Sequence, residues 1–249
     1  MTTYYSPRIR IHDVIERAKS TTVDLTVYYN GAAVTPSAAT FRLASPSNGD
    51  TIATTSATIV GSTVQYSISA SEIPSTLSLS DGYMQYWTLT ISGEVHTFKK
   101  PTAISLSSLY PVITDLDLEA EYSDLASIRP STMNSYQTYL DEAWVQLIQR
   151  IRDQGNLEYL IMSPQSLRSC HKNLTFYLIF KDMDSSGLGE GRYLELAKEH
   201  RKEMEFDFKR LKFTYDQSQS GYPDDVNKQR SAVSVIYTAA PPIWYRRLR

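Results

Sequence analysis

Residues 83–98 read YMQYWTLTISGEVHTF, which is two strand-like runs on either side of Ser92-Gly93. Apolar and polar residues alternate in these runs, as they do in a strand with one buried face. A Ser-Gly pair between two such runs favours a tight hairpin turn. Similar short runs, separated by glycine-containing turns, begin near residue 20. Many short strands at this spacing predict a β-sandwich over residues 20–104.

The segments on either side of this region follow other patterns. Residues 9–19 are predicted to form a short helix, with Asp13 as its cap. After Pro101 the chain becomes acidic, and residues 105–130 carry five carboxylates. Runs of charge are usually solvated, so this stretch is predicted to be an exposed linker.

From Ser131 onward the apolar residues recur three and four positions apart, which is the period of an amphipathic helix. The first predicted helix has its cap at Ser131 or Thr132 and ends at Gly155. A second helix is predicted to begin near Pro164, because proline is favoured in the first turn. A third helix is predicted to end near Gln217 and to use as its apolar face Leu194, Ala197, Met204, Phe208, Leu211 and Tyr215.

The last part of the sequence combines a short strand with a cationic segment. Residues 231–238 alternate again and predict a strand, which Pro241-Pro242 would end. Exposed aromatic residues beside arginine are typical of interaction hot spots, so we expect the segment that follows to bind a partner; packing onto the protein's own core is the alternative. The residues expected to make this contact are Ile243, Trp244, Tyr245, Arg246, Arg247 and Arg249.

Residues 181–193, KDMDSSGLGEGRY, have features of two kinds of binding loop. From Asp182 to Gly187 the oxygen-bearing residues and the glycine match the first half of a calcium loop, but Tyr193 at the twelfth position supplies no carboxylate. The glycines also lack the preceding strand that a phosphate-binding turn requires. A turn between helices is therefore favoured over a calcium site, and the same holds for residues 215–221.

The sequence contains no recognisable catalytic constellation. Cys170 is the single cysteine, and His171 beside it would point about 100° away on a helix. We therefore expect no enzyme activity, no metal and no cofactor. A net charge of −2 gives no basic signature for nucleic acid. Because no apolar run reaches 18 residues, we expect a soluble protein made in a reducing cytoplasm, with no membrane contact.

Two short motifs carry a resemblance to a known family. They are residues 109–112, LYPV, and residues 211–216, LKFTYD, which Gly221 follows. Together with the order of helices, short β element and extended C-terminal tail, they make residues 105–249 resemble the head–tail connector proteins (adaptor or neck proteins) of tailed bacteriophages. The strand-rich half is similar to the immunoglobulin-like accessory domains of virion proteins.

The resemblance implies a non-enzymatic structural protein of the virion, located at the head–tail junction and made in the host cytoplasm. It implies a homo-oligomeric ring, commonly dodecameric, between the portal protein and a tail or neck protein. DNA would pass through the ring without sequence-specific binding and be ejected through it, and the C-terminal tail would dock on a neighbouring ring. The alternative is an accessory virion protein that binds carbohydrate or a host receptor through residues 20–103.

The predicted fold class is therefore α+β with several domains. An immunoglobulin-like β-sandwich precedes a helical bundle, which has a short β element and an extended tail. The expected divisions are an arm with a short helix at 1–19, the sandwich at 20–104, the linker at 105–130, the helical connector domain at 131–240 and the docking tail at 241–249.

Overall fold

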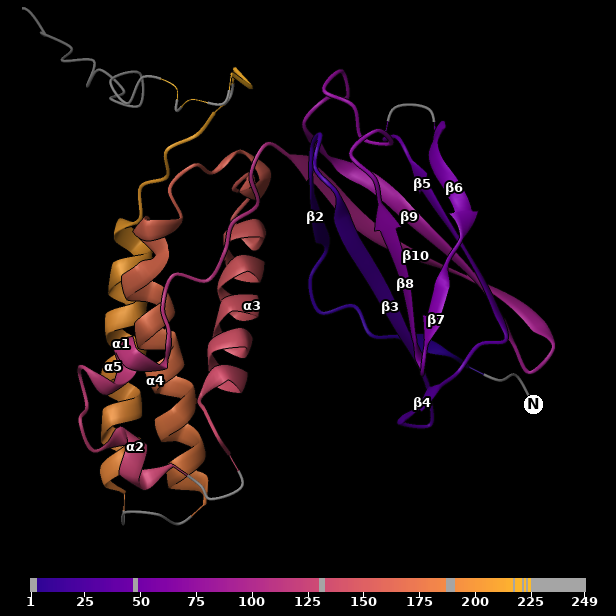
Figure 1. Cartoon of the computed structure of the whole chain (residues 1–249). Coiled ribbons are helices and arrows are strands. Elements are labelled where there is room, and N and C mark those ends of the chain that lie inside the picture. The colour runs from indigo at the N-terminus through magenta and orange to yellow at the C-terminus, as the bar shows by residue number, and fades with distance from the viewer. Residues whose placement is uncertain are drawn as a thin grey trace, which may run out of the picture.

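The computed structural model describes residues 4–46, 49–129, 133–186, 191–216, 218–220, 222 and 224 of the 249-residue chain. A strand-rich region comes first and a helical region follows, so the chain is a mixed α+β protein. Figure 1 shows the strands on one side of the molecule and the long helices on the other.

Among the described residues, the strands form two five-stranded sheets. In the first sheet every pairing is antiparallel. Its order is β1 (Ser6–Pro7), β3 (Thr21–Tyr29), β8 (Thr63–Ile68) and β7 (Thr58–Val60), and β4 (Ala32–Val34) also pairs with β3.

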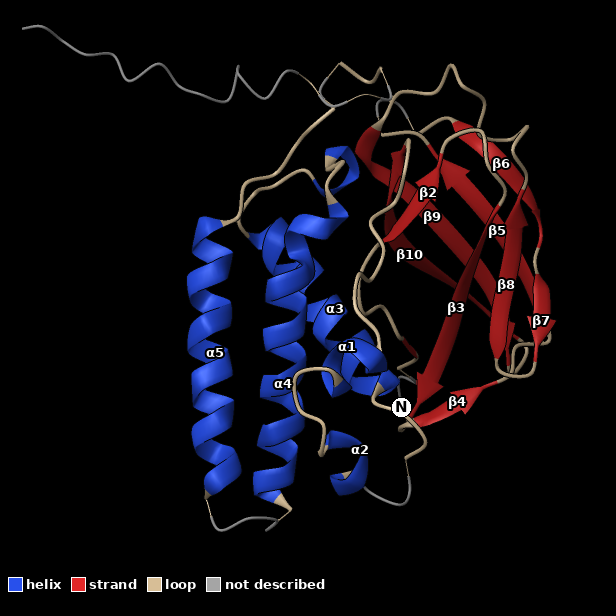
Figure 2. Cartoon of the chain, turned by 60° about the vertical axis from the view of Figure 1, so that its left-hand side comes forward, coloured by secondary structure: helices blue, strands red, loops and turns tan. Residues whose placement is uncertain are grey.

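The second sheet is mixed, because its edge strand β2 runs parallel to β10 while the other pairs are antiparallel. Figure 2 shows this sheet behind β3 and β8 of the first. Its order is β2 (Asp13–Glu16), β10 (Glu94–Ser105), β9 (Ser80–Ile91), β5 (Ala38–Ala44) and β6 (Thr51–Ser56).

The predicted hairpin at Ser92-Gly93 is confirmed. Ile91 pairs with Glu94 across the turn, and both turn residues have positive φ, 53° for Ser92 and 84° for Gly93. A two-residue turn with positive φ at both positions matches the right-handed twist of the strands that it joins.

One apolar core lies between the two sheets. It is built from the inward-facing residues of both, such as Leu25 on β3 and Leu89 on β9, which are each 1% exposed. Near its centre Trp87 meets Phe41 edge to face, with ring centroids 4.8 Å apart. The alternation seen in the sequence thus places every second residue of β9 in this core.

The helix predicted over residues 9–19 is wrong. Asp13–Glu16 form β2, whose residues pair with 102–105 of β10. Ile15 points into the core and is fully buried. Pairing with the open edge of β10 satisfies the backbone groups of this short segment, which outweighs its local helical pattern.

In the described part of the chain, three long helices follow the strands, with four short ones between and before them. α3 ends before Gly155, whose φ is 79°, and Pro164 begins a short helix, both as predicted. α3 begins only at Gln137, and the predicted caps, Ser131 and Thr132, lie outside the described residues. The helices are α1 (Asp115–Glu119), α2 (Leu125–Ile128), α3 (Gln137–Asp153), η1 (Glu158–Leu160), η2 (Pro164–Leu167), α4 (Arg168–Ser185) and α5 (Arg192–Arg210).

The third helix ends earlier than the apolar pattern predicted. α5 stops at Arg210, and Leu211 is already extended, with ψ 133°. The chain then pairs with the stretch before η2, where Tyr215 forms a β-bridge with Ile161. Leu211, Phe213 and Tyr215 are spaced two apart, so their alternation belongs to an extended segment. The strand predicted for residues 231–238 lies outside the described part of the chain.

The acidic stretch at 105–130 is not the solvated linker that its composition predicted. Leu118 and Leu125 are fully buried and pack with Phe180 of α4 in one cluster. The carboxylates of this stretch pair with cations of α4: Asp117 with Arg168 and Glu121 with Lys172. The segment therefore forms part of the helical region.

The strand-rich and helical regions contact each other through several side chains. Tyr159 of η1 packs against the core of the sheets. Ser108, which follows β10, donates hydrogen bonds of 2.9 Å from its amide and its hydroxyl to Glu16 of β2. Arg10 pairs with Glu142 of α3. Within the described residues, no helix is long and apolar enough to cross a membrane.

Candidate functional site

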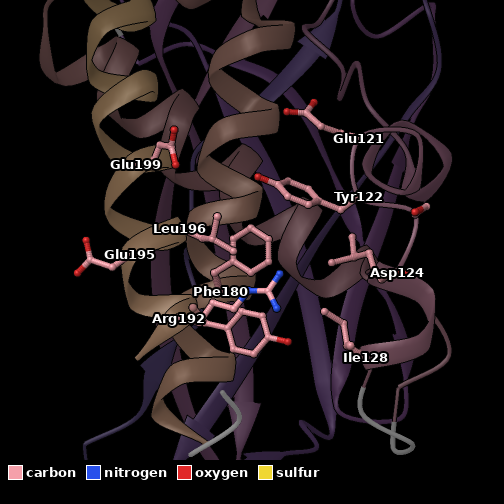
Figure 3. Close-up of a pocket in the computed structure, with 12 residues that line it drawn as sticks. Glu121, Tyr122, Asp124, Ile128, Phe180, Arg192, Glu195, Leu196 and Glu199 are labelled. Atoms are coloured by element: carbon pink, nitrogen blue, oxygen red, sulfur yellow. The ribbon is translucent and has the colours of Figure 1, made fainter. Parts of the chain in front are cut away.

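A pocket of about 620 Å³ opens between the loop that leads into α2 and the first half of α5. Figure 3 shows acidic side chains at its margins, with Glu195 and Glu199 on one side and Glu121 on the other. The lining residues are Glu121, Tyr122, Ser123, Asp124, Leu125, Ile128, Phe180, Arg192, Tyr193, Glu195, Leu196 and Glu199.

Aromatic side chains form the inner surface of this pocket. Tyr122 meets Phe180 edge to face at a centroid distance of 5.3 Å, and Phe180 is stacked with Tyr193 at 5.9 Å. Leu125 lies beside them and is fully buried. The pocket thus offers apolar contact area inside and carboxylates at its opening.

A buried hydrogen-bond chain fixes Tyr122 in this position. The Nδ1–H of His200 donates to Oδ1 of Asn173 at 3.0 Å, because an amide carbonyl can only accept. Nε2 of His200 then accepts from the hydroxyl of Tyr122 at 2.8 Å. The Asn173 amide donates in turn to Asp207 at 3.3 Å. Burial lowers the pKa of His200, which keeps the ring neutral as this chain requires.

The carboxylates give the pocket a negative potential. Burial raises the pKa of Tyr122, and the neighbouring charges of Glu121, Glu199 and Glu203 raise it further. Glu121 pairs with Lys172, and Glu195 lies 2.8 Å from the ammonium of Lys198. These cations leave part of the acidic charge at the pocket uncompensated.

A second polar cluster lies where the two regions meet. Nε2 of His12 is 3.3 Å from Oε2 of Glu158, and both side chains are almost fully buried. Burial lowers the pKa of His12 to about 4 and raises that of Glu158 to about 7. Arg152 approaches the same carboxylate, with its Nε 4.0 Å away. Between about pH 4 and pH 7 the close contact is therefore one between neutral groups.

The predicted loop at 181–193 is shorter than expected. Asp182 and Asp184 belong to the last turn of α4, and Asp182 accepts a hydrogen bond of 2.6 Å from Tyr139 of α3. Residues 187–190 lie outside the described part of the chain. Among the described residues, no group of three or more His, Cys, Asp or Glu side chains could hold a metal ion.

In the similar stretch at 215–221, Asp216 binds its own loop. Its Oδ1 accepts hydrogen bonds from the amide of Ser220 at 2.9 Å and from the hydroxyl of Ser218 at 3.3 Å. Asp216 is 1% exposed. An aspartate that bonds the backbone a few residues on is typical of turn chemistry.

The single cysteine lies in the core of the helical region. Cys170 is fully buried, and burial raises its pKa to about 12. The neighbouring His171 donates from Nε2 to the carbonyl of Leu140 at 3.0 Å. The two side chains therefore have separate environments.

The sequence did not point to either of the clusters that the fold assembles. The pocket takes residues from around α2, from α4 and from α5, and His12 and Glu158 lie about 150 residues apart in the sequence. The only available signal was the acidity of residues 115–124, which was interpreted as solvation. The six residues expected to bind a partner, from Ile243 to Arg249, lie outside the described residues.

Comparisons with known proteins assign no family to this chain. No family model matches it, and no curated protein does. Fourteen chains of solved structures match. They include an engineered protein with 15% identity and a TM-score of 0.30, in which the match covers 42% of this chain and 20% of that one. Another is E. coli alpha-2-macroglobulin, with 7% identity, a TM-score of 0.29, and coverage of 39% and 6%.

A β-glucosidase from Listeria innocua in complex with glucose also matches, with 9% identity, a TM-score of 0.23, and coverage of 40% of this chain and 16% of that one. The present chain thus spans a fifth or less of the length of these structures. Likeness at such TM-scores carries no argument about function.

Proposed function

We propose that this protein is a structural subunit of the head–tail connector of a tailed bacteriophage. The observation that carries the proposal is the meeting of the two motifs that resemble this family. Leu109 from the first motif and Leu211 and Tyr215 from the second pack against one apolar cluster that α3, α4 and α5 share. Motifs that lie far apart in the sequence therefore form one structural unit, as expected if a single family fold specifies both.

The helical region is, in this proposal, the connector domain. Its three long helices, α3, α4 and α5, contribute Leu147, Leu174 and Phe208 to one apolar cluster, which supports a bundle. α4 and α5 lie side by side along their length in both views (Figures 1 and 2). Copies of such a bundle would form a ring between the portal protein and a tail or neck protein.

The strand-rich region is, in this proposal, an immunoglobulin-like accessory domain. The strand orders β1-β3-β8-β7 and β10-β9-β5-β6 match the A-B-E-D and G-F-C-C′ orders of that fold, and β2 adds an edge strand beside β10. The hydroxyl of Tyr83 at the start of β9 donates to the carbonyl of Ser78 at 2.8 Å. A tyrosine that bonds the backbone a few residues upstream is a recurring feature at this corner of such domains.

In this proposal the partners are further copies of the chain, the portal protein and a tail or neck protein. A ring requires two different complementary surfaces on each copy, and residues 243–249 would supply one of them. A net charge of −2 suits a channel that must let DNA pass without holding it. No catalytic step and no cofactor enter this function.

The direct test is electron microscopy of the full-length chain mixed with the portal protein encoded beside its gene. We expect closed rings of many copies stacked on one face of the portal. A chain that stays monomeric and never joins the portal contradicts the proposal.

Removal of residues 241–249 tests the role of the segment within this function. We expect assembly on the portal to be lost while the melting temperature stays within about 2 °C of the parent, because in this proposal the segment binds a partner and not the core of its own chain. Unaltered assembly would refute a docking role for residues 241–249. Whether the chain forms a ring would still be decided by the electron microscopy.

A further inference from the structure

The pocket between α2 and α5 has an uneven charge. Its lining includes four acids and one base, Arg192. Two of the acids, Asp124 and Glu199, have no ion-pair partner among the described side chains. Both are exposed at the opening, where a cation from another molecule can reach them without displacing a residue of this chain.

The inner part of the pocket favours an aromatic or aliphatic side chain. Phe180, Leu196 and Ile128 line it together with the two tyrosines, and Figure 3 shows the labelled apolar residues between the acidic margins. A volume of about 620 Å³ lies within the range of pockets that hold a compact organic ligand. The chemistry that fits is therefore a large apolar group beside one or more cations.

Residues 243–249, IWYRRLR, have this chemistry. Trp244 and Tyr245 precede Arg246 and Arg247, and no acidic residue follows Asp225 in the chain. Arginine forms forked hydrogen bonds with carboxylates and also stacks on aromatic rings. Tryptophan beside arginine is a combination that dominates binding energy at interfaces.

We propose that the pocket is the acceptor for residues 243–249 of a neighbouring copy of this chain. The arginines meet the carboxylates of Asp124, Glu195 and Glu199, and the indole of Trp244 lies against the apolar lining. The inference rests on the proposed function in one respect, since it requires that copies of the chain assemble.

Chain length permits contact between copies. The pocket lies beside the first half of α5, whereas the described chain continues from the other end of this helix, after Arg210. Residues 225–242 separate the last described residue from residues 243–249, and these 18 residues span at most about 60 Å when extended. α5 itself is only about 28 Å long at its rise per residue. Residues 243–249 can therefore reach the pocket of a neighbouring copy as well as that of their own copy, and a ring requires the contact between copies.

Photo-crosslinking of the full-length chain tests the contact. Trp244 is replaced by the photo-reactive p-benzoylphenylalanine, and this heavy-isotope-labelled protein is mixed with unlabelled parent before irradiation. We expect mass spectrometry to find heavy–light crosslinks from position 244 to residues 121–128 and 192–199. Crosslinks confined to other surfaces, or formed only within one copy, overturn the inference.

Charge exchange tests the chemistry of the contact. The variants Glu195→Lys/Glu199→Lys and Arg246→Glu/Arg247→Glu should each lower the heavy–light crosslink yield about tenfold, since several exposed ion pairs become repulsions. A mixture of the two should restore the yield, because opposite charges face each other again. The control Glu94→Lys, at the first residue of β10 and 77% exposed at its side chain, should leave the yield unchanged. Equal yields for the parent and both charge variants overturn the inference.

The two proposals can fail separately. Rings on the portal without crosslinks to the pocket leave the connector function standing and reject the pocket as acceptor. Crosslinks between copies at the pocket without any portal complex support the acceptor and reject the connector function.

Discussion

At the scale of single residues, the His12–Glu158 contact is the clearest source of pH dependence. The folded chain holds the Glu158 proton up to about pH 7, although the usual pKa is 4.5. An unfolded chain has released that proton above pH 4.5, so the contribution of Glu158 to stability falls as the pH rises between these values. His12 acts in the opposite direction: its pKa drops from 6.5 to about 4, so its contribution is lost as the pH falls through that range.

Glu158→Gln isolates the first of these two effects. The variant keeps the shape of the neutral side chain but cannot ionise. Relative to this variant, we expect the parent's free energy of unfolding to fall by about 3 kcal/mol between about pH 4.5 and pH 8, because the pKa of Glu158 is raised from 4.5 to about 7 in the folded chain. Urea unfolding at a series of pH values measures the difference. Glu94→Gln, at an exposed side chain, should follow the parent; a Glu158→Gln curve parallel to the parent contradicts the assignment.

At the scale of elements, the β9–β10 turn can be altered without touching any side-chain packing. A Cβ at Gly93 would have no atom within 4 Å, so Gly93→Ala changes only the cost of a φ of 84°. We expect this variant to lose about 1 kcal/mol of stability. Ser92→Asn should gain up to about 1 kcal/mol, because asparagine accepts positive φ more readily and Asn-Gly is the preferred pair in such turns.

Thermal unfolding measures both changes, and the pair acts as its own control. Opposite shifts of the melting temperature are expected from adjacent positions in one turn. Shifts of the same sign would mean that the turn is not limited by its backbone conformation.

The elements that the sequence predicted are those with a strong local signal. A few neighbouring residues encode each of these signals: the strand alternation around Trp87, the end of a helix at Gly155 and the start of one at Pro164. β2 was missed because four residues are too few for a period to appear, and its partner β10 lies far away in the sequence. The end of α5 was misplaced because Leu211 and Tyr215 also fit a helical spacing.

At the scale of the whole molecule, Tyr159 links the helical region to the core of the sheets. Tyr159→Ala removes this ring and should lower the free energy of unfolding by about 2 kcal/mol. Because the ring contributes to the core of the other region, we expect β9 and α3 to lose protection together in hydrogen exchange. Tyr4→Ala, at a side chain that is 80% exposed, is the matched control and should change neither. Loss of protection in α3 alone contradicts a shared core.

The candidate site belongs to this largest scale, and for that reason the sequence could not reveal it. The carboxylates of the pocket come from two segments about 70 residues apart, and only the packing of α2 beside α4 and α5 brings them together. The acidity of residues 115–124 could be recognised in the sequence. The burial of Leu118 and Leu125 could not, because the charged residues around them favour a solvated segment. The cationic segment, by contrast, is continuous in the sequence and could be singled out at once.

The parallel pairing of β2 with β10 determines how this chain would respond to force. Tension between the first strands and the helical region pulls β2 toward its beginning and β10 toward its end. Since the two strands run in the same direction, they are drawn past each other lengthwise, and the hydrogen bonds along residues 13–16 and 102–105 resist together. A hairpin pulled at its open end yields one bond at a time. The edge of the second sheet is therefore a mechanical clamp between the start of the chain and its helices.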